Sequence, residues 1–241
     1  ASAQESRVMG IWSGESEIMR ILNDGTNFHT QMAAQIYGMA YEELQAQYKA
    51  EVPVAIERRQ MGKLTNLACN FRIGGKSLSK KALTEHDTYM TEIEGRKLVS
   101  TFKRAYPGVP AYWDAIVEFA KQNGYSYTLA QRRYKVDKAM LASSDAWKVE
   151  GTVISHPIQG TGAEMFLAAL SSVPDARIQT NMHDGVFWIV DEGQAGVEES
   201  EYILEQMNKT NYEQLWGLPT PLPIKLQYEG SRIGTSYADV K

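Results

Sequence analysis

The chain has 241 residues, of which 43% are hydrophobic and 22% charged, and its net charge is −4, values typical of a folded soluble protein. They exclude a disordered chain, a collagen-like repeat and a disulfide-stabilised scaffold. The single cysteine, Cys69, has no partner for an internal disulfide, so we expect a reducing compartment.

The first twenty residues do not resemble a targeting segment. Charged residues such as Glu5, Arg7 and Arg20 interrupt them, and no apolar run in the sequence reaches the length that spans a bilayer. We therefore expect a soluble cytoplasmic protein that has no membrane partner.

The first two thirds of the chain carry helical patterns separated by turn signals. Residues 1–12 fit either a strand or the start of a helix, and Ser13-Gly14 ends this segment. Asn27 is a typical helix cap, and Gly38 suits the left-handed position after a helix. The patterns predict helices over 15–22, 27–38, 41–50, from about 55 to the Gly74-Gly75 pair, and over 77–83, 88–104 and 110–123.

The last third of the chain adds strands. Residues 125–129 are aromatic and β-branched, as in a strand or hairpin arm, and a helix over 148–172 must be kinked or interrupted at Pro157. Asp184-Gly185 is a hairpin turn signal. The remaining predicted elements are strands over 177–182 and 186–190, a helix over 195–209 and a strand over 224–228. Helices followed by strands indicate an α+β fold.

One segment of this acidic chain is basic. Residues 57–81 contain seven Lys or Arg and one Glu, a net charge of +6. Such a local excess favours a site for a polyanion, and the alternative is a solvated helix face.

Within this segment, Arg59, Lys63, Leu67 and Phe71 recur at intervals of four. On a helix this spacing forms one stripe with two cations followed by two apolar side chains. The stripe could bind a polyphosphate at one end and cover a flat ring at the other, because Arg offers a planar fork and Lys a point charge. The alternative is that Leu67 and Phe71 are core residues.

His183-Asp184 lies in the predicted hairpin turn. A carboxylate on a tight turn can bind a divalent cation, and two-metal phosphoryl transfer needs at least two such carboxylates. The alternative is an ordinary polar turn, because Asp-Gly is common in hairpins whatever their function.

Six motifs follow one another along the chain in an order that resembles one enzyme family. They are Ala1-Ser2-Ala3-Gln4-Glu5-Ser6-Arg7, Gly25-x-x-Phe28-His29-Thr30, Arg59-x-x-x-Lys63-x-x-Asn66-Leu67-x-x-x-Phe71, Tyr106-Pro107 with Gly124-Tyr125-x-x-Thr128-Leu129-x-x-Arg132-Arg133, Pro157-Ile158-Gln159-Gly160-Thr161-Gly162-Ala163-Glu164, and His183-Asp184. Over essentially its whole length the chain resembles the C-terminal half of a family A DNA polymerase, the DNA polymerase I family. Leu67 and Arg72 suggest a phage-type branch.

The resemblance implies an incomplete right-hand fold of the α+β class. Helical fingers would be joined to the C-terminal part of a palm with an antiparallel sheet. Residues 1–13 would form a palm strand, residues 14–148 the fingers, and residues 149–241 the C-terminal palm.

The reaction implied by the resemblance is template-directed transfer of a deoxynucleotide to a primer 3′ end, with two Mg²⁺ ions. Asp184 and the backbone carbonyl of Ala1 would be metal ligands. Asp184, Arg59 and Lys63 would be catalytic, with Lys63 as proton donor to the departing pyrophosphate.

The resemblance also implies residues for the two substrates, a deoxynucleoside triphosphate and primer–template DNA. The implied nucleotide-binding residues are Glu5, His29, Arg59, Lys63, Leu67 and Phe71. Among them, Glu5 would crowd the sugar 2′ position, Leu67 would lie where Phe is usual, and Phe71 would replace a tyrosine beside the templating base. The implied DNA-binding residues are Ser155, Gln159 and His183 at the primer–template minor groove, and Arg132 and Arg133 at the template strand.

Departures from the family pattern lead to three hypotheses. Gly185 replaces an acidic residue, and the aspartate that opens the first motif would precede Ala1. We expect one piece of a split or cleaved polymerase, inactive alone, whose N-terminal partner fragment supplies that aspartate, the thumb and the rest of the palm, in a bacterial or phage-infected cell. The alternatives are a non-catalytic DNA-binding remnant and a single-subunit RNA polymerase, which Glu5 disfavours.

Overall fold

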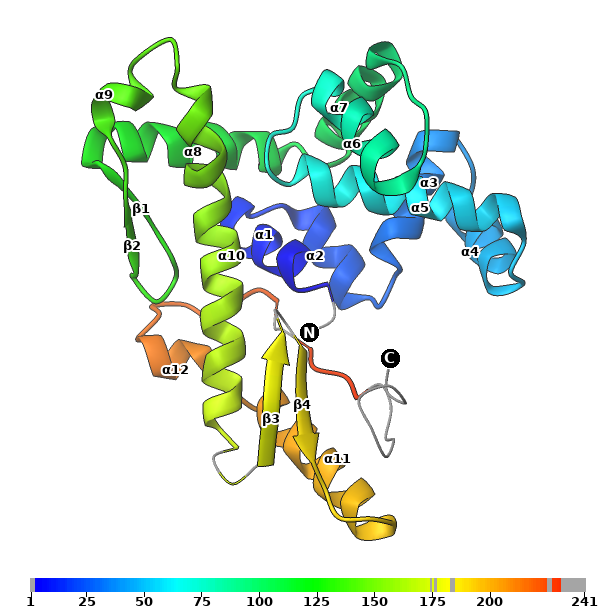
Figure 1. Cartoon of the computed structure of the whole chain (residues 1–241), viewed down its shortest axis with the longest axis vertical. Coiled ribbons are helices and arrows are strands. Elements are labelled where there is room, and N and C mark those ends of the chain that lie inside the picture. The colour runs from blue at the N-terminus through cyan, green and yellow to red at the C-terminus, as the bar shows by residue number, and fades with distance from the viewer. Residues whose placement is uncertain (1–2, 174, 176, 183–184, 225–226, 231–241) are drawn as a thin grey trace.

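The computed structural model describes residues 3–173, 175, 177–182, 185–224 and 227–230. Figure 1 shows a long central helix, α10, with most of the other helices grouped around its first half and a two-stranded hairpin beside its second half. The elements are α1 (Gln4–Ser13), α2 (Ser16–Asn23), α3 (Phe28–Tyr37), α4 (Tyr41–Lys49), α5 (Pro53–Cys69), α6 (Gly75–His86), α7 (Glu92–Ala105), α8 (Gly108–Asn123), β1 (Tyr125–Tyr127), β2 (Arg133–Lys135), α9 (Lys138–Leu141), α10 (Trp147–Ser171), β3 (Arg177–Met182), β4 (Gly185–Ile189), α11 (Gln194–Asn208) and α12 (Tyr212–Trp216).

The first element corrects a prediction. The palm strand expected over residues 1–13 is wrong for residues 4–13, which form α1. This helix packs against two others, because its side chains point in all directions around the axis. A Cβ at Gly10 would contact Ile18 of α2, and Gln4 lies against Gly162 of α10. The division into units at residues 13 and 148 stays a prediction.

The helices α3, α4 and α5 form one packed group on the side of the molecule away from β1 and β2 (Figure 1). As predicted, Asn27 caps α3 by accepting a hydrogen bond from the backbone N–H of Thr30, and Gly38 ends the helix with a left-handed φ of 64°. The three helices share a small apolar cluster made of Ala33, Ala34, Leu44 and Ala55.

The main core joins the helices around α10. Trp113 of α8 and Phe102 of α7 are buried and stacked, and the indole N–H of Trp113 donates to the carbonyl of Asn70 at 2.9 Å. The Tyr112 hydroxyl donates to the carbonyl of Ile154 of α10 at 2.8 Å. The helix α10 runs unbroken through the buried Pro157, so the interruption that we considered there does not occur.

Two small antiparallel sheets complete the described part of the chain. β1 pairs with β2, and β3 pairs with β4 with an irregularity between Ile178 and Thr180. A mostly helical chain with antiparallel hairpins confirms the α+β prediction. β2, α9 and α12 were not predicted. The strand expected over 224–228 lies partly outside the described residues, and its remaining residues form no strand. No helix in the described part of the chain has the length and hydropathy needed to cross a membrane.

Candidate functional site

The site begins where α3 and α5 touch. Gly62 of α5 faces the first turns of α3: a Cβ there would overlap the carbonyl oxygen of His29 and lie 2.8 Å from the backbone nitrogen of Ala33. Arg59 and Lys63 flank this glycine on α5. The contact therefore brings one histidine and two cations, all predicted from the sequence, to one place.

The two cations act electrostatically on the histidine. Burial, followed by the charges of Arg59 and Lys63, lowers the pKa of His29 to about 4. Asn66 fixes the local backbone by donating to the carbonyl of Phe28 at 3.0 Å, and its amide nitrogen lies 3.4 Å from Nδ1 of His29. His29 is thus a neutral hydrogen-bonding group at neutral pH, and the positive charge comes from α5.

Arg59 is held from the side of α4. Its guanidinium lies 4.6 Å from the ring centroid of Tyr48, a cation–π distance. Its Nε is buried and finds no hydrogen-bond partner among the described residues. Lys63 is exposed on the same helix. The guanidinium is therefore oriented and still able to donate hydrogen bonds to a ligand.

A cleft of about 880 Å³ opens at this place, within the size range of small-molecule sites. Residues from each of the helices α1 to α5 and from the segment after α12 line it, among them Arg7, His29, Lys49, Arg59 and Glu229. Cations, carboxylates and a neutral histidine all line this nucleotide-sized cleft, and its basic part suits a polyphosphate.

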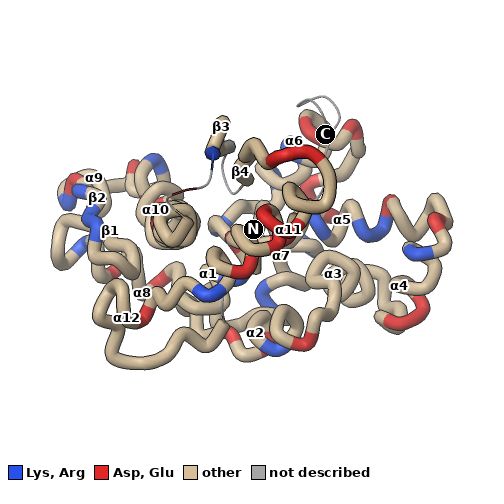
Figure 2. Tube along the Cα trace, turned by 90° about the horizontal axis from the view of Figure 1, so that it is seen from below, with Lys and Arg blue, Asp and Glu red and all other residues tan. Residues whose placement is uncertain are grey.

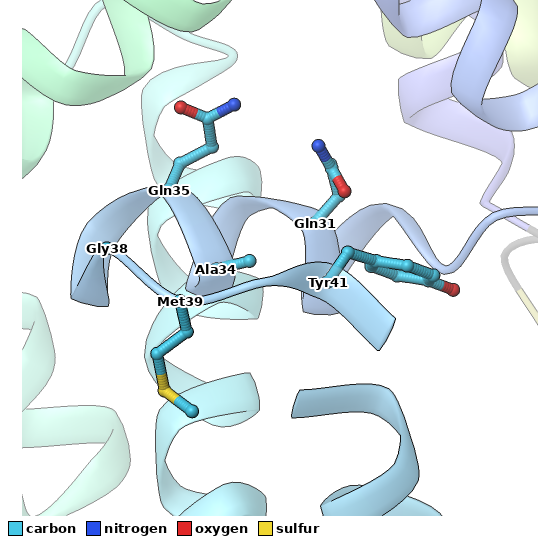
Figure 3. Close-up of a pocket in the computed structure, with 6 residues that line it drawn as sticks. All are labelled: Gln31, Ala34, Gln35, Gly38, Met39 and Tyr41. Carbon is cyan, nitrogen blue, oxygen red and sulfur yellow. The ribbon is translucent and has the colours of Figure 1, made fainter. Parts of the chain in front are cut away.

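A smaller pocket of about 260 Å³ lies at the turn between α3 and α4 (Figure 3). Its lining is uncharged: the amides of Gln31 and Gln35 lie on one side of α3, and Met39 points the other way. Without a charged group it does not suit a phosphate.

The helices α1 and α10 bring together two further predicted residues. The Gln159 amide donates to Oε1 of Glu5 at 3.3 Å. Ser155 lies one turn before Gln159 and on the same face of α10, because the two positions are four apart. Glu5, Ser155 and Gln159 therefore lie on one surface between α1 and α10.

The predicted arginines lie at the start of β2. Nε of Arg132 is 2.8 Å from Oε1 of Glu164 of α10, and Arg133 covers the ring of Tyr125 at 4.5 Å. Figure 2 shows this basic hairpin at one end of the molecule, near α9, with acidic residues gathered on α11. Arg132 is thus already engaged in an ion pair, which the sequence did not indicate.

The apolar half of the predicted stripe is only partly helical. Leu67 lies on α5 and is half-buried, but α5 ends at Cys69 and Phe71 lies in the turn that follows. The prediction of one continuous helical stripe is therefore wrong at Phe71. The turn has Arg72 at a φ of 62°, a conformation that ends a helix.

The predicted metal ligands Asp184 and Ala1, together with His183, lie outside the described residues. In the described part of the chain, no three His, Cys, Asp or Glu side chains converge as a metal site would require.

Comparison with known proteins identifies the family. Residues 1–236 match the sequence family described as DNA polymerase family A. The chain belongs to DNA polymerase family A. Its resemblance to that family, inferred above from six motifs, is confirmed, whereas the phage-type branch stays a prediction.

Individual polymerases are similar over most of this chain. It is 24% identical to DNA polymerase I of Chloroflexus aurantiacus, in a match that covers 92% of this chain and 22% of that protein. It is 25% identical to the thermostable DNA polymerase I of Thermus caldophilus, in a match that covers 92% of this chain and 25% of that protein. Among solved structures, the POL domain of Pol1 from M. smegmatis, in complex with DNA primer–template and dNTP, matches with a TM-score of 0.72 and 22% identity, over 94% of this chain and 37% of that one. The chain therefore has part of the polymerase-domain fold and spans about a quarter of these curated relatives.

The sequence patterns assign no role to three site residues. Gly62 carried a usable signal, since a glycine inside a helix often marks a close approach. Asn66 stood in the family motif but was given no role. Tyr48, in a helix predicted as merely polar, carried no signal for its contact with Arg59.

Proposed function

We propose that this chain forms the nucleotide-binding and template-facing part of an enzyme that performs template-directed DNA synthesis. The observation that carries the proposal is the convergence of His29 with Arg59 and Lys63 beside the cleft of about 880 Å³. Membership of DNA polymerase family A supports the same reaction class.

In this proposal the triphosphate of an incoming deoxynucleotide binds to α5. Arg59 donates its hydrogen bonds to the phosphate oxygens, and Lys63 neutralises their charge and gives a proton to the departing pyrophosphate. His29, neutral in the free protein because of burial and the two cations, donates or accepts a hydrogen bond at the same group. Leu67 and Phe71 cover the base pair that forms.

Glu5 and the DNA-contacting residues set the substrate in this proposal. Glu5, tied to Gln159, excludes a ribose 2′-hydroxyl. Ser155, Gln159 and His183 face the minor groove near the primer end. Arg132 and Arg133 contact the template backbone, which positions the DNA without reading its sequence.

Asp184 and the backbone carbonyl of Ala1 are the proposed ligands for two Mg²⁺ ions, and oxygen donors of this kind are those that Mg²⁺ prefers. When bound, Mg²⁺ stabilises the charge on the attacking and leaving oxygens.

We further propose that the chain works within a larger polymerase. The support is that it spans about a quarter of its curated relatives. In this proposal the thumb and the rest of the palm lie in the part that it does not span. Those parts would be supplied by a polymerase segment N-terminal to this one, on the same polypeptide or on a partner fragment.

Primer extension with Mg²⁺ tests this function. We would compare this chain alone, an N-terminal polymerase fragment alone, and the two mixed. Extension that requires this chain and is lost in Asp184→Ala supports the proposal. DNA binding without extension in every mixture would contradict it and favour a non-catalytic remnant.

A further inference from the structure

One face of α4 lines the cleft and has no role in the function proposed above. Glu42, Gln45, Ala46 and Lys49 all line it, and their spacing of three, four and seven residues places them on one side of the helix. Glu42 and Lys49 lie almost two turns apart, so Lys49 makes one end of this face basic, and Gln45 lies between the two.

Two polar groups at this end of the cleft lack partners. Oε1 of Gln45 and Nε of Arg59 are both buried without a hydrogen-bond partner in the part of the chain that the structure describes. They come from different helices, and both residues line the same cleft. A buried donor without a partner costs free energy, which an anion that accepts a hydrogen bond from Nε of Arg59 would recover. The Gln45 amide can turn about its terminal bond to present its N–H groups to an anion.

Tyr48 controls how Arg59 faces this space. Its ring packs on the small apolar cluster shared by α3, α4 and α5, so it is anchored rather than free. With the ring 4.6 Å from the guanidinium carbon, one face of the arginine is occupied and its N–H edges stay available. The guanidinium edge is the part that binds phosphate in a two-pronged manner.

We propose that Lys49 and Gln45 of α4, together with Arg59, form a diphosphate subsite, and that Tyr48 is the positioning residue for Arg59. The ligand is a diphosphate group, either the terminal phosphates of a bound nucleoside triphosphate or the free pyrophosphate released after transfer. The inference rests on the proposed function, which supplies both the nucleoside triphosphate and the pyrophosphate. It adds α4 to the helices that bind phosphate in this cleft.

Calorimetric titration without primer–template DNA tests the subsite. The probes are inorganic pyrophosphate and dATP, each in the presence of a chelator, added to the wild-type chain and to Lys49→Ala and Tyr48→Leu. We expect each variant to lose roughly fivefold or more in affinity, since each weakens a charge-assisted contact. A loss for dATP and pyrophosphate together assigns the subsite to the bound triphosphate. A loss for pyrophosphate alone assigns it to the released product.

Matched variants separate positioning from folding. Tyr48→Phe keeps the ring and should bind pyrophosphate like the wild type. Tyr37→Leu removes the ring over which Arg58 lies at 5.2 Å, and Lys97→Ala removes an exposed lysine of α7; neither should change the affinity. Thermal unfolding of every variant would confirm that the chain is folded in the titrations.

Unchanged affinity for both probes in Lys49→Ala and Tyr48→Leu would overturn the subsite, as would failure of the folded wild-type chain to bind either probe. An equal loss in Tyr48→Leu and Tyr48→Phe would overturn the positioning role. Because no DNA synthesis is measured, these results are separate from the primer-extension test. Intact pyrophosphate binding without primer extension would contradict the proposed function alone.

Discussion

The backbone carbonyl of His29 on α3 lies directly against Gly62 on α5, with no room for a Cβ between the two helices. This contact sets the distance between the histidine and the two cations that flank the glycine. The geometry of the proposed triphosphate site therefore depends on a residue that has no side chain.

Substitution of this glycine should destabilise the protein. Gly62→Ala would force the helices apart, and we expect a loss of about 2 kcal/mol in the free energy of unfolding, measured by urea denaturation. Gly151→Ala is the matched control, because Gly151 lies in α10 with nothing near its Cβ position and should gain up to about 1 kcal/mol from helix propensity. The same sign of change in both variants would contradict this explanation.

The stability of the chain should fall in mild acid because of His29. Its pKa is lowered from an ordinary value near 6.5 to about 4, so the unfolded chain binds the proton more readily than the folded one. The stabilisation is fully present above pH 6.5 and is lost as the pH falls toward 4, by up to about 3 kcal/mol.

The measurement is the free energy of unfolding of wild type and His29→Gln between pH 7 and pH 4. The variant should lose less stability over this range. Burial, followed by the charge of Arg132, also lowers the pKa of His156, so His156 contributes to the pH dependence of both proteins. The contribution of His29 is therefore the difference in pH dependence between wild type and variant. Identical pH dependence in both proteins would show that His29 is not the group that titrates.

Because Arg132 pairs with Glu164, substitution of this proposed DNA-binding residue should also lower the stability of the protein. The Glu164 side chain is only 16% exposed, and its Oε2 finds no partner within the described residues. Arg132→Ala would leave this carboxylate without its counter-charge and should cost about 2 kcal/mol of unfolding free energy.

A double-mutant cycle with Glu164→Gln separates this cost from DNA binding. Glu164→Gln should restore most of the stability lost in Arg132→Ala. If the double variant is stable and still binds primer–template DNA more weakly than Glu164→Gln does, the template contact proposed for Arg132 stands. Full recovery of DNA binding would leave Arg132 with a structural role alone.

The contact between Glu5 and Gln159 predicts the sugar preference. Glu5→Ala should raise ribonucleotide use relative to deoxynucleotide use by about tenfold or more, because the space at the 2′ position would open. Gln159→Ala, which removes a single hydrogen bond to Glu5, should have a smaller effect. Competition between dATP and ATP in single-nucleotide extension measures both, and unchanged preference in Glu5→Ala would exclude its proposed role.

Much of the site could be predicted from the sequence because its signals are local. The Asn27 cap and Gly38 fix the ends of α3, and the spacing of Arg59 and Lys63 places both on one helix. The family motifs gave the remaining residues without any knowledge of their contacts.

Contacts between distant segments could not be predicted in the same way. Nothing near Tyr48 indicates that its ring lies under Arg59, and nothing near Arg132 indicates its pairing with Glu164. The spacing of four residues wrongly predicted that Phe71 lies on the helix, because the spacing continues in the sequence after α5 has ended at Cys69. Tertiary packing, rather than local pattern, decides such positions.

The proposed function requires that α5 bind and activate the triphosphate for DNA synthesis. The most direct test is single-turnover incorporation of one deoxynucleotide by a polymerase assembly that contains this chain, with Lys63→Ala and the exposed-lysine control Lys97→Ala compared with wild type. We predict a rate about a hundredfold lower for Lys63→Ala, typical of the loss of a proton donor, and no change for Lys97→Ala. Equal rates in all three proteins would contradict the claim.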